Sequence, residues 1–287
     1  MAAYRLAGQD FYFPNPLPEL EPFKINDGTA VSAVPFVHHS FHENELISRS
    51  KGWVGGVQCN VKVYAISHGI LLKVKGGSEI FITSHGEAIS KRNPQEAPSQ
   101  LDREIILGPA LVLALALHDT WSLHASAVLC RETTIAFLGE SGQGKSTLAA
   151  YLSSIDNPDW RLAADDILPV TISSTGVDVW PRFPQLKLPL QAQPGPGLPE
   201  HLPLNALCVL TSAGQEEIPE LQLLPPNLAT RELISHTAGT RMFTPELLGN
   251  HLAFCTHVAG QVPVYRLTYP HRRNTLPKIK TLLESIC

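Results

Sequence analysis

The sequence has no surplus of positive charge and no apolar run long enough to cross a membrane. Its 287 residues carry 22 Lys and Arg against 26 Asp and Glu, a formal net charge of -4. Because nucleic acids and anionic membranes attract excess positive charge, we expect neither of them as a partner. The longest apolar stretch, from Ile105 to Leu117, is shorter than the ~20 residues that span a bilayer and is interrupted by Gly108 and Pro109. It is typical of a buried helix instead.

Residues that form disulfides or bind metals are scarce or unsuitably spaced. The cysteines are odd in number, far apart and never arranged as Cys-x-x-Cys: Cys59, Cys130, Cys208, Cys255 and Cys287. They predict neither a disulfide framework nor a zinc site, and they fit a reducing cytoplasm. Residues 1–10 also lack the basic start and apolar core of a secretory signal. The neighbouring His38, His39 and His42 are more typical of a solvated loop than of a metal site.

The composition predicts a folded protein of two domains. Hydrophobic residues make up 44% and charged residues 17%, which excludes disorder throughout. The polar segment Ser84–Gln100 contains Pro94 and Pro98 and is the best candidate for a linker. We therefore predict a β-rich N-terminal domain over residues 1–100, with substrate recognition as its candidate role, and a larger domain over residues 101–287.

The first domain is predicted to be mostly β, because short runs rich in β-branched and aromatic residues alternate with glycine-bearing turns. The runs are Val31–Val37, Val61–Ile66, Ile70–Val74 and Glu79–Thr83. Before them, Tyr4–Phe23 is rich in proline and aromatic residues without a helical period. We expect this segment to lie extended against a partner surface.

The second domain is predicted to be α/β, because strand and helix patterns alternate along it. Strands are expected at Ser122–Leu129, Thr133–Leu138, Arg161–Asp165, Ile167–Ile172, Ala206–Thr211 and Val262–Tyr269. Helices are expected at Leu101–His118, Lys145–Ser154, Leu228–His236, Pro245–Val258 and Thr275–Ser285.

A glycine-rich motif stands between a predicted strand and a predicted helix and matches the phosphate-binding pattern G-x-x-x-x-G-K-[ST]. Glycines let successive backbone N–H groups turn toward phosphate oxygens, and the helix N-terminus adds positive potential. We expect Lys145 to be a solvent-facing cation for the β- and γ-phosphates of ATP, and Ser146 to bind Mg²⁺. The predicted nucleotide-binding residues are Gly139, Glu140, Ser141, Gly142, Gln143, Gly144, Lys145, Ser146 and Thr147. A coincidental glycine turn is the alternative.

Two adjacent acids, Asp165 and Asp166, end the strand predicted at Arg161–Asp165. One carboxylate there can support Mg²⁺, a role that we assign to Asp165, while its neighbour faces an acceptor hydroxyl. A solvated turn or a helix cap is the alternative. His124 lies on an otherwise apolar strand before the motif, where a structural histidine is commoner than a catalytic one.

The ordered set of His124, Gly139–Ser146 and Leu162-Ala163-Ala164-Asp165-Asp166 resembles the catalytic domain of HPr kinase/phosphorylase, a bacterial serine kinase. The resemblance covers residues 118–170. It implies a P-loop kinase domain of that family's C-terminal type, with ATP and Mg²⁺ as cofactors and assembly as a homo-oligomer. It also implies a catalytic centre of His124, Lys145 and Asp166, with Asp166 as the base toward a serine hydroxyl and Mg²⁺ on Ser146.

The sequence departs from that family at several points. Thr147 replaces a usual glutamate and a downstream Glu-Ile-Arg-Gly signature is missing, so the reverse phosphorylase reaction is not implied. The stretches Trp180–Leu188 and Tyr265–Pro270 are similar to those of kinases encoded beside ribosomally made peptides, including lasso peptides. The implied acceptor is a serine of a peptide or protein. The alternatives are a kinase for a small hydroxylated molecule and a nucleotide-dependent switch without transfer activity.

Four further cations have two interpretations each. Arg231 and Arg241 are candidates to stabilise the transferred phosphoryl group or to form surface salt bridges. Arg182 and Lys187 lie among prolines after the paired acids, where they contact an acidic substrate or merely solvate a loop.

Overall fold

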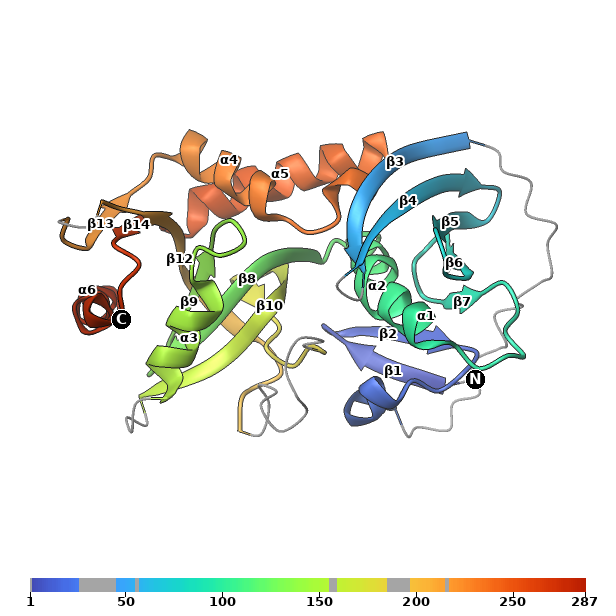
Figure 1. The fold of residues 1–287 in the computed structure, drawn as a ribbon, viewed down its shortest axis with the longest axis horizontal. Helices are drawn as coiled ribbons and strands as arrows, with labels where there is room; N and C mark the ends of the chain where they lie inside the picture. Colours follow the sequence, from blue (N-terminus) through green and yellow to red (C-terminus); the bar gives the residue numbers. More distant parts are fainter. Residues whose placement is uncertain (1, 26–44, 55–56, 155–158, 185–196, 215–216) are drawn as a thin grey trace. The chain divides into compact units, whose positions relative to one another are not determined.

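The computed structural model describes residues 2–25, 45–54, 57–154, 159–184, 197–214 and 217–287. The chain forms two compact units, shown in Figure 1: Met1–Thr120 with Gly239–Leu248, and Trp121–Ala238 with Gly249–Cys287. The mixed α/β architecture predicted from the sequence is confirmed. The strand predicted at Val31–Val37, the histidines of residues 38–42 and Lys187 lie outside the described residues.

The first unit contains two antiparallel sheets. A hairpin joins β1 (Ala2–Leu6) to β2 (Gln9–Phe13), and the 3-10 helix η1 (Pro18–Phe23) follows it. A five-stranded sheet has the order β3-β4-β5-β6-β7. Its strands are β3 (Glu45–Val54), β4 (Val57–Ile66), β5 (Gly69–Val74), β6 (Glu79–Thr83) and β7 (Ile89–Lys91).

The N-terminal hairpin corrects the expectation that Tyr4–Phe23 lies extended against a partner. Tyr4 and Phe11 are fully buried, and the Tyr4 hydroxyl accepts a hydrogen bond from the Leu17 backbone N–H at 3.0 Å. Ala7 and Gly8 have φ values of 49° and 75°, as the two central residues of a type I′ hairpin turn do. Because that turn folds the segment back on itself, the aromatic side chains pack within the chain's own core.

The predicted helix at Leu101–His118 is confirmed as a nearly continuous helical segment. It consists of α1 (Gln100–Ile105), the π-helix η2 (Ile106–Ala110) and α2 (Leu111–Ala116). Pro109 lacks a backbone N–H, which accounts for the wider π-helical turn around it. Ser99 caps α1, and its side chain accepts a hydrogen bond from the backbone N–H of Asp102.

Asp102 ties this helical segment to the first unit. Its carboxylate accepts hydrogen bonds from the backbone N–H groups of Ser78 at 2.8 Å and Ser99 at 3.0 Å. The two units therefore divide after Thr120, and not near Gln100 as the proline-containing segment suggests. Proline content does not reveal a hydrogen bond between residues that are far apart in the sequence.

We expect Asp102→Asn to lower the free energy of unfolding by about 1–2 kcal/mol at neutral pH, because one part-buried N–H loses its acceptor. Burial by itself raises the pKa of Asp102, but the hydrogen bonds from Ser78 and Ser99 outweigh it and the net pKa is lowered. The carboxylate therefore stabilises the fold at pH values above the usual pKa range of carboxyl groups. This stabilisation is lost as the pH falls through the folded-state pKa of Asp102.

Urea unfolding followed by circular dichroism at about pH 7 and about pH 3 measures this effect. The exposed Asp119→Asn is the control, because Asp119 has a φ of 53° that asparagine adopts readily. An Asp102→Asn deficit that is equally large at both pH values contradicts the assignment.

The second unit is built on a seven-stranded sheet of order β11-β10-β8-β9-β12-β14-β13. The strands are β8 (Trp121–Cys130), β9 (Thr133–Leu138), β10 (Trp160–Ser173), β11 (Gly176–Val179), β12 (Leu202–Ser212), β13 (Glu220–Leu223) and β14 (Val264–Tyr269). β9, β12 and β14 are parallel to one another, and the other pairings are antiparallel.

Helices lie on both faces of this sheet. They are α3 (Lys145–Ser154), α4 (Pro226–His236), α5 (Pro245–Gln261) and α6 (Leu276–Glu284), with the short 3-10 turn η5 (Arg273–Thr275). The 3-10 turn η4 (Thr240–Met242) belongs to the first unit. None of the helices in the described ranges is both long and apolar enough to span a membrane.

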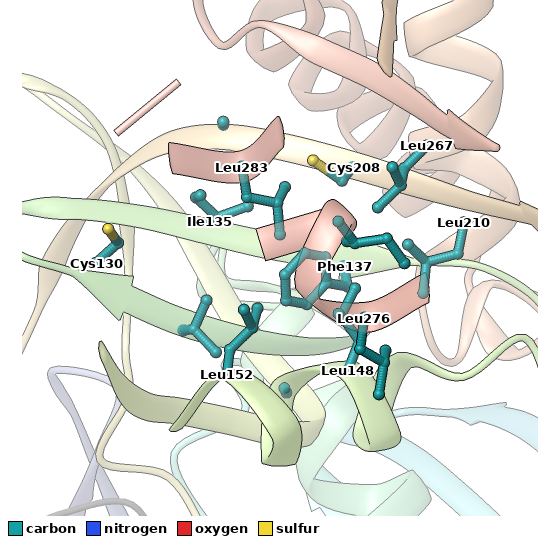
Figure 2. Close-up of a cluster of buried hydrophobic side chains, with 14 of the residues drawn as sticks. Cys130, Ile135, Phe137, Leu148, Leu152, Cys208, Leu210, Leu267, Leu276 and Leu283 are labelled. Carbon is teal, nitrogen blue, oxygen red and sulfur yellow. The ribbon is translucent and has the colours of Figure 1, made fainter. Parts of the chain in front are cut away.

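A buried cluster holds α3 and α6 against one face of the sheet (Figure 2). Phe137 of β9 packs in one cluster with Leu148 of α3 and Leu276 of α6. Val128 of β8 belongs to the same cluster, whereas Trp121 of β8 packs against α5. Because side chains alternate along a strand, the even-numbered residues of β8 face α3.

Candidate functional site

The glycine-rich loop of residues 139–144 connects β9 directly to α3. Gly139, Gly142 and Gly144 have φ values of 149°, 87° and 89°, a region that other residues rarely adopt. A Cβ on Gly144 would also lie 2.8 Å from the hydroxyl oxygen of Tyr269. Both the backbone conformation and the available space therefore require glycine at position 144.

Residues at the ends of β12 and β14 hold this loop in place. The Tyr269 hydroxyl donates to the backbone oxygen of Gln143 at 2.9 Å, and burial raises its pKa to about 12, so it remains a donor at neutral pH. The Ser212 hydroxyl donates to Oε1 of Gln143 at 2.9 Å and lies 3.2 Å from Nε2 of His271. The sequence analysis did not find these contacts, because the residues lie far from the loop in the chain.

The sequence predicts that Lys145 faces solvent, but the structure places it in a buried position beneath the loop. The residue is 7% exposed, and Nζ donates to the backbone oxygens of Gly139 at 2.6 Å and Glu140 at 3.2 Å. The reason is that carbonyl groups of the curled loop provide the ammonium with acceptors close to the start of α3. Lys145 therefore both braces the loop and provides a cation to the pocket beside it.

The paired acids lie within a strand and not at its end, which corrects the sequence prediction. β10 is continuous from Trp160 to Ser173, because β8 pairs with it on both sides of the acids. Asp165 lies opposite Ser126 in this register, and Asp166 lies opposite Ala125.

The two carboxylates have different surroundings. Oδ1 of Asp165 accepts a hydrogen bond from the Ser126 hydroxyl at 2.5 Å, in a buried position. Regular alternation would place Asp166 on the opposite face of the sheet from Asp165. Asp166 instead has a φ of 90°, and its Oδ1 lies 3.2 Å from Nε2 of His124. The unusual backbone angle thus brings Asp166 to the same face as His124.

A pocket of about 200 Å³ lies between the loop, the start of α3 and strands β8 and β10. Its lining residues are His124, Ser126, Ser141, Gly142, Gly144, Lys145, Ser146, Thr147 and Asp166. The fold thus brings together the three residues proposed as catalytic from the sequence, although they come from three separate elements. Asp165, Gly139, Glu140 and Gln143 are not among these lining residues.

The oxygen groups of the pocket suit a hard cation better than a transition metal. Among the described residues, no three His, Cys, Asp or Glu side chains form a metal-binding group. Mg²⁺ prefers one or two protein oxygens together with water and phosphate, so it does not need such a group. The Ser146 hydroxyl and the Asp166 carboxylate line the pocket, whereas the Asp165 carboxylate is engaged by Ser126.

His236 is a neighbour of the site that the sequence analysis did not find. An isolated bridge between Leu123 and Thr237 and a 2.8 Å hydrogen bond from the Ala238 N–H to the Ser122 carbonyl oxygen place the end of α4 beside β8. Burial lowers the pKa of His236, although Glu232 opposes this effect, and the ionisable side chains around it include Glu140 and Lys145. The histidine is therefore mostly neutral at neutral pH.

The candidate arginines lie on exposed surfaces. Arg231 is 65% exposed and forms an ion pair of 3.2 Å with Glu232, in agreement with the salt-bridge interpretation. Glu232 also lies 3.8 Å from Arg266. Arg182 is exposed, and Arg241 is exposed in the first unit.

Comparison with known proteins gives a distant structural resemblance. The sequence matches no family model and no curated protein significantly. The structure of the Hpr(Ser) kinase/phosphatase from Coxiella burnetii is similar with 13% sequence identity and a TM-score of 0.33. The match covers 57% of this chain and 88% of that chain. At this level the resemblance carries no argument about residue roles.

Proposed function

We propose that the chain is an ATP-dependent kinase that transfers the γ-phosphoryl group to a serine or threonine hydroxyl of a peptide or protein. The observation that supports this proposal is the shared pocket, which Lys145 and Ser146 line together with the His124–Asp166 pair. Phosphoryl transfer requires positioned cations on one side and a proton acceptor for the hydroxyl on the other.

In this proposal the glycine-rich loop is a P-loop that binds the phosphates. The N-terminus of α3 and the backbone N–H groups of the loop attract anionic oxygens. Lys145 moves its ammonium from the carbonyl oxygens of Gly139 and Glu140 toward the β- and γ-phosphates. The pocket, at about 200 Å³, is smaller than the ~300 Å³ lower limit of common small-molecule sites. It therefore suits the phosphate end of a nucleotide and not the whole molecule.

Asp166 is the proposed base. As the acceptor oxygen forms its bond to the γ-phosphorus, the bond from that phosphorus to the β–γ bridging oxygen breaks and ADP leaves. The proton of the acceptor hydroxyl passes to the Asp166 carboxylate. His124, 3.2 Å away, holds that carboxylate toward the pocket.

Mg²⁺ would neutralise charge on the phosphate oxygens when bound. The proposed protein ligand in the pocket is the Ser146 hydroxyl, with Asp165 in a supporting role. For that role, Asp165 must share its carboxylate between the cation and the Ser126 hydroxyl, which now donates to it at 2.5 Å.

The proposed acceptor class comes from the sequence resemblance to kinases of ribosomally made peptides, and the exposure of the site is compatible with it. The His124 side chain is 38% exposed and that of Asp166 is 19% exposed. Both side chains are therefore partly accessible to solvent, as a site for a hydroxyl of another molecule requires.

The test is incubation with ATP labelled at the γ-phosphate, a serine-containing precursor peptide, free serine and a panel of sugars. We expect label on the peptide, located on a serine by mass spectrometry. Label on a sugar or on free serine would support the small-molecule kinase instead. ATP binding without transfer to any acceptor would support the switch.

A further inference from the structure

The parallel strands β9, β12 and β14 end at one edge of the sheet. β12 pairs in parallel with both of its neighbours, so Leu138, Ser212 and Tyr269 end their strands at the same edge. Ligands of open α/β sheets bind in the crevice at the carboxyl ends of such strands. His124 and Asp166 lie on β8 and β10, which are on the other side of β9 in the strand order.

Ser212, Tyr269 and His271 form a group at this edge that we call the Ser212–His271 ledge. The rings of Tyr269 and His271 lie 5.1 Å apart at an angle of 34°. His271 and Ser212 are exposed. Hydrogen bonds from Ser212 and Tyr269 to Gln143 connect the ledge to the glycine-rich loop.

We propose that the nucleoside end of the nucleotide binds on the Ser212–His271 ledge, with its base stacked on the His271 ring. This inference rests on the proposed function. A triphosphate with its γ end at His124 and Asp166 and its phosphates on the loop directs its nucleoside away from β8 and β10. The strands on that side are β12 and β14. An aromatic ring that rests on a second ring offers a flat surface on which any base stacks.

The experiment compares the binding of Mg·ATP with that of Mg·tripolyphosphate by calorimetry, because tripolyphosphate has the phosphates without the nucleoside. We expect His271→Ala to weaken ATP binding by about tenfold, in the range of base–aromatic stacking, and to leave tripolyphosphate binding unchanged. His271→Phe loses the contact with Ser212 but keeps an aromatic ring. Because the ring is what the base stacks on in this proposal, this variant is expected to retain ATP affinity. His257→Ala changes an exposed histidine of α5 and is the control.

Three results would overturn the inference. If His271→Ala weakens both ligands equally, the residue braces the loop through Ser212 and does not bind the base. If neither affinity changes, the nucleoside lies elsewhere, and the proposed kinase function still stands. If the wild-type protein binds neither ligand, the loop is not a phosphate site and the proposed function fails as well.

Discussion

Replacement of Asp166 by asparagine is expected to lower phosphoryl transfer by about a hundredfold or more, the loss typical of a positioned base. Binding of Mg·ATP should stay close to that of the wild-type protein, because asparagine has the same size. Asparagine also tolerates the φ of 90° found at this position better than most residues do. The fold of β10 is therefore expected to survive the change.

The adjacent Asp165→Asn variant is the matched comparison. If Asp165 supports Mg²⁺ as proposed, the Asp165→Asn variant weakens magnesium-dependent nucleotide binding, and excess Mg²⁺ partly restores its rate. The measurement is a magnesium titration of ATP binding and of initial rate for both variants. A pure rate defect in Asp165→Asn with a metal defect in Asp166→Asn would exchange the two roles, and normal transfer in both would remove the acids from the mechanism.

Ser126→Ala separates a metal role of Asp165 from a structural one. It removes the donor of the 2.5 Å hydrogen bond and leaves the charge of Asp165 in place. If Asp165 supports Mg²⁺, Ser126→Ala should keep a normal magnesium dependence. If it reproduces the Asp165→Asn defect, Asp165 acts through its contact with β8.

Lys145→Met is the second change with a large expected effect. Removal of the ammonium is expected to reduce transfer by about a hundred- to a thousandfold, the usual effect of losing one preorganised donor to developing charge. Methionine is preferred to alanine because Lys145 is buried, and alanine would leave a cavity beneath the loop. The variant also leaves the Gly139 and Glu140 carbonyl oxygens without this donor, so a modest loss of stability is expected.

Initial rates and thermal unfolding are measured together for Lys145→Met and for Lys278→Met, an exposed lysine of α6 that serves as the control. A folded Lys145→Met protein with the wild-type rate would contradict the mechanism. A rate loss with an unchanged melting temperature would show that the cation acts on the substrate and contributes little to the loop.

The elements that the sequence predicts best are those whose pattern lies in consecutive residues. The strand Thr133–Leu138 and the helix Lys145–Ser154 were predicted with the bounds that the structure shows. An apolar run, closely spaced glycines and a helix start follow one another there, and backbone sterics act over that same short range. The positive φ values at Gly139, Gly142 and Gly144 agree with this local reasoning.

The errors lie where distant residues compete with the local pattern. The acids appear to end a strand because polar residues interrupt an apolar run, yet β8 continues to pair with β10 past Asp166. Tyr4 and Phe11 were expected to pack against a partner, yet both are buried within the chain, where Phe11 contacts the ring of His118. In each case a hydrogen-bonded or packed neighbour from another segment decided the outcome.

The sequence by itself determined the residue types of the candidate site: a glycine-rich turn, a lysine, a hydroxyl, a histidine and two acids. The family resemblance implied that Asp166 joins His124, but only the tertiary structure gives the physical reason, because that contact depends on strand register and on the φ of one residue. It also decided that Tyr269 and Ser212 hold the loop. These contacts join residues more than sixty positions apart. They arise from the parallel pairing of β12 with β9 and β14, and no short-range pattern encodes them.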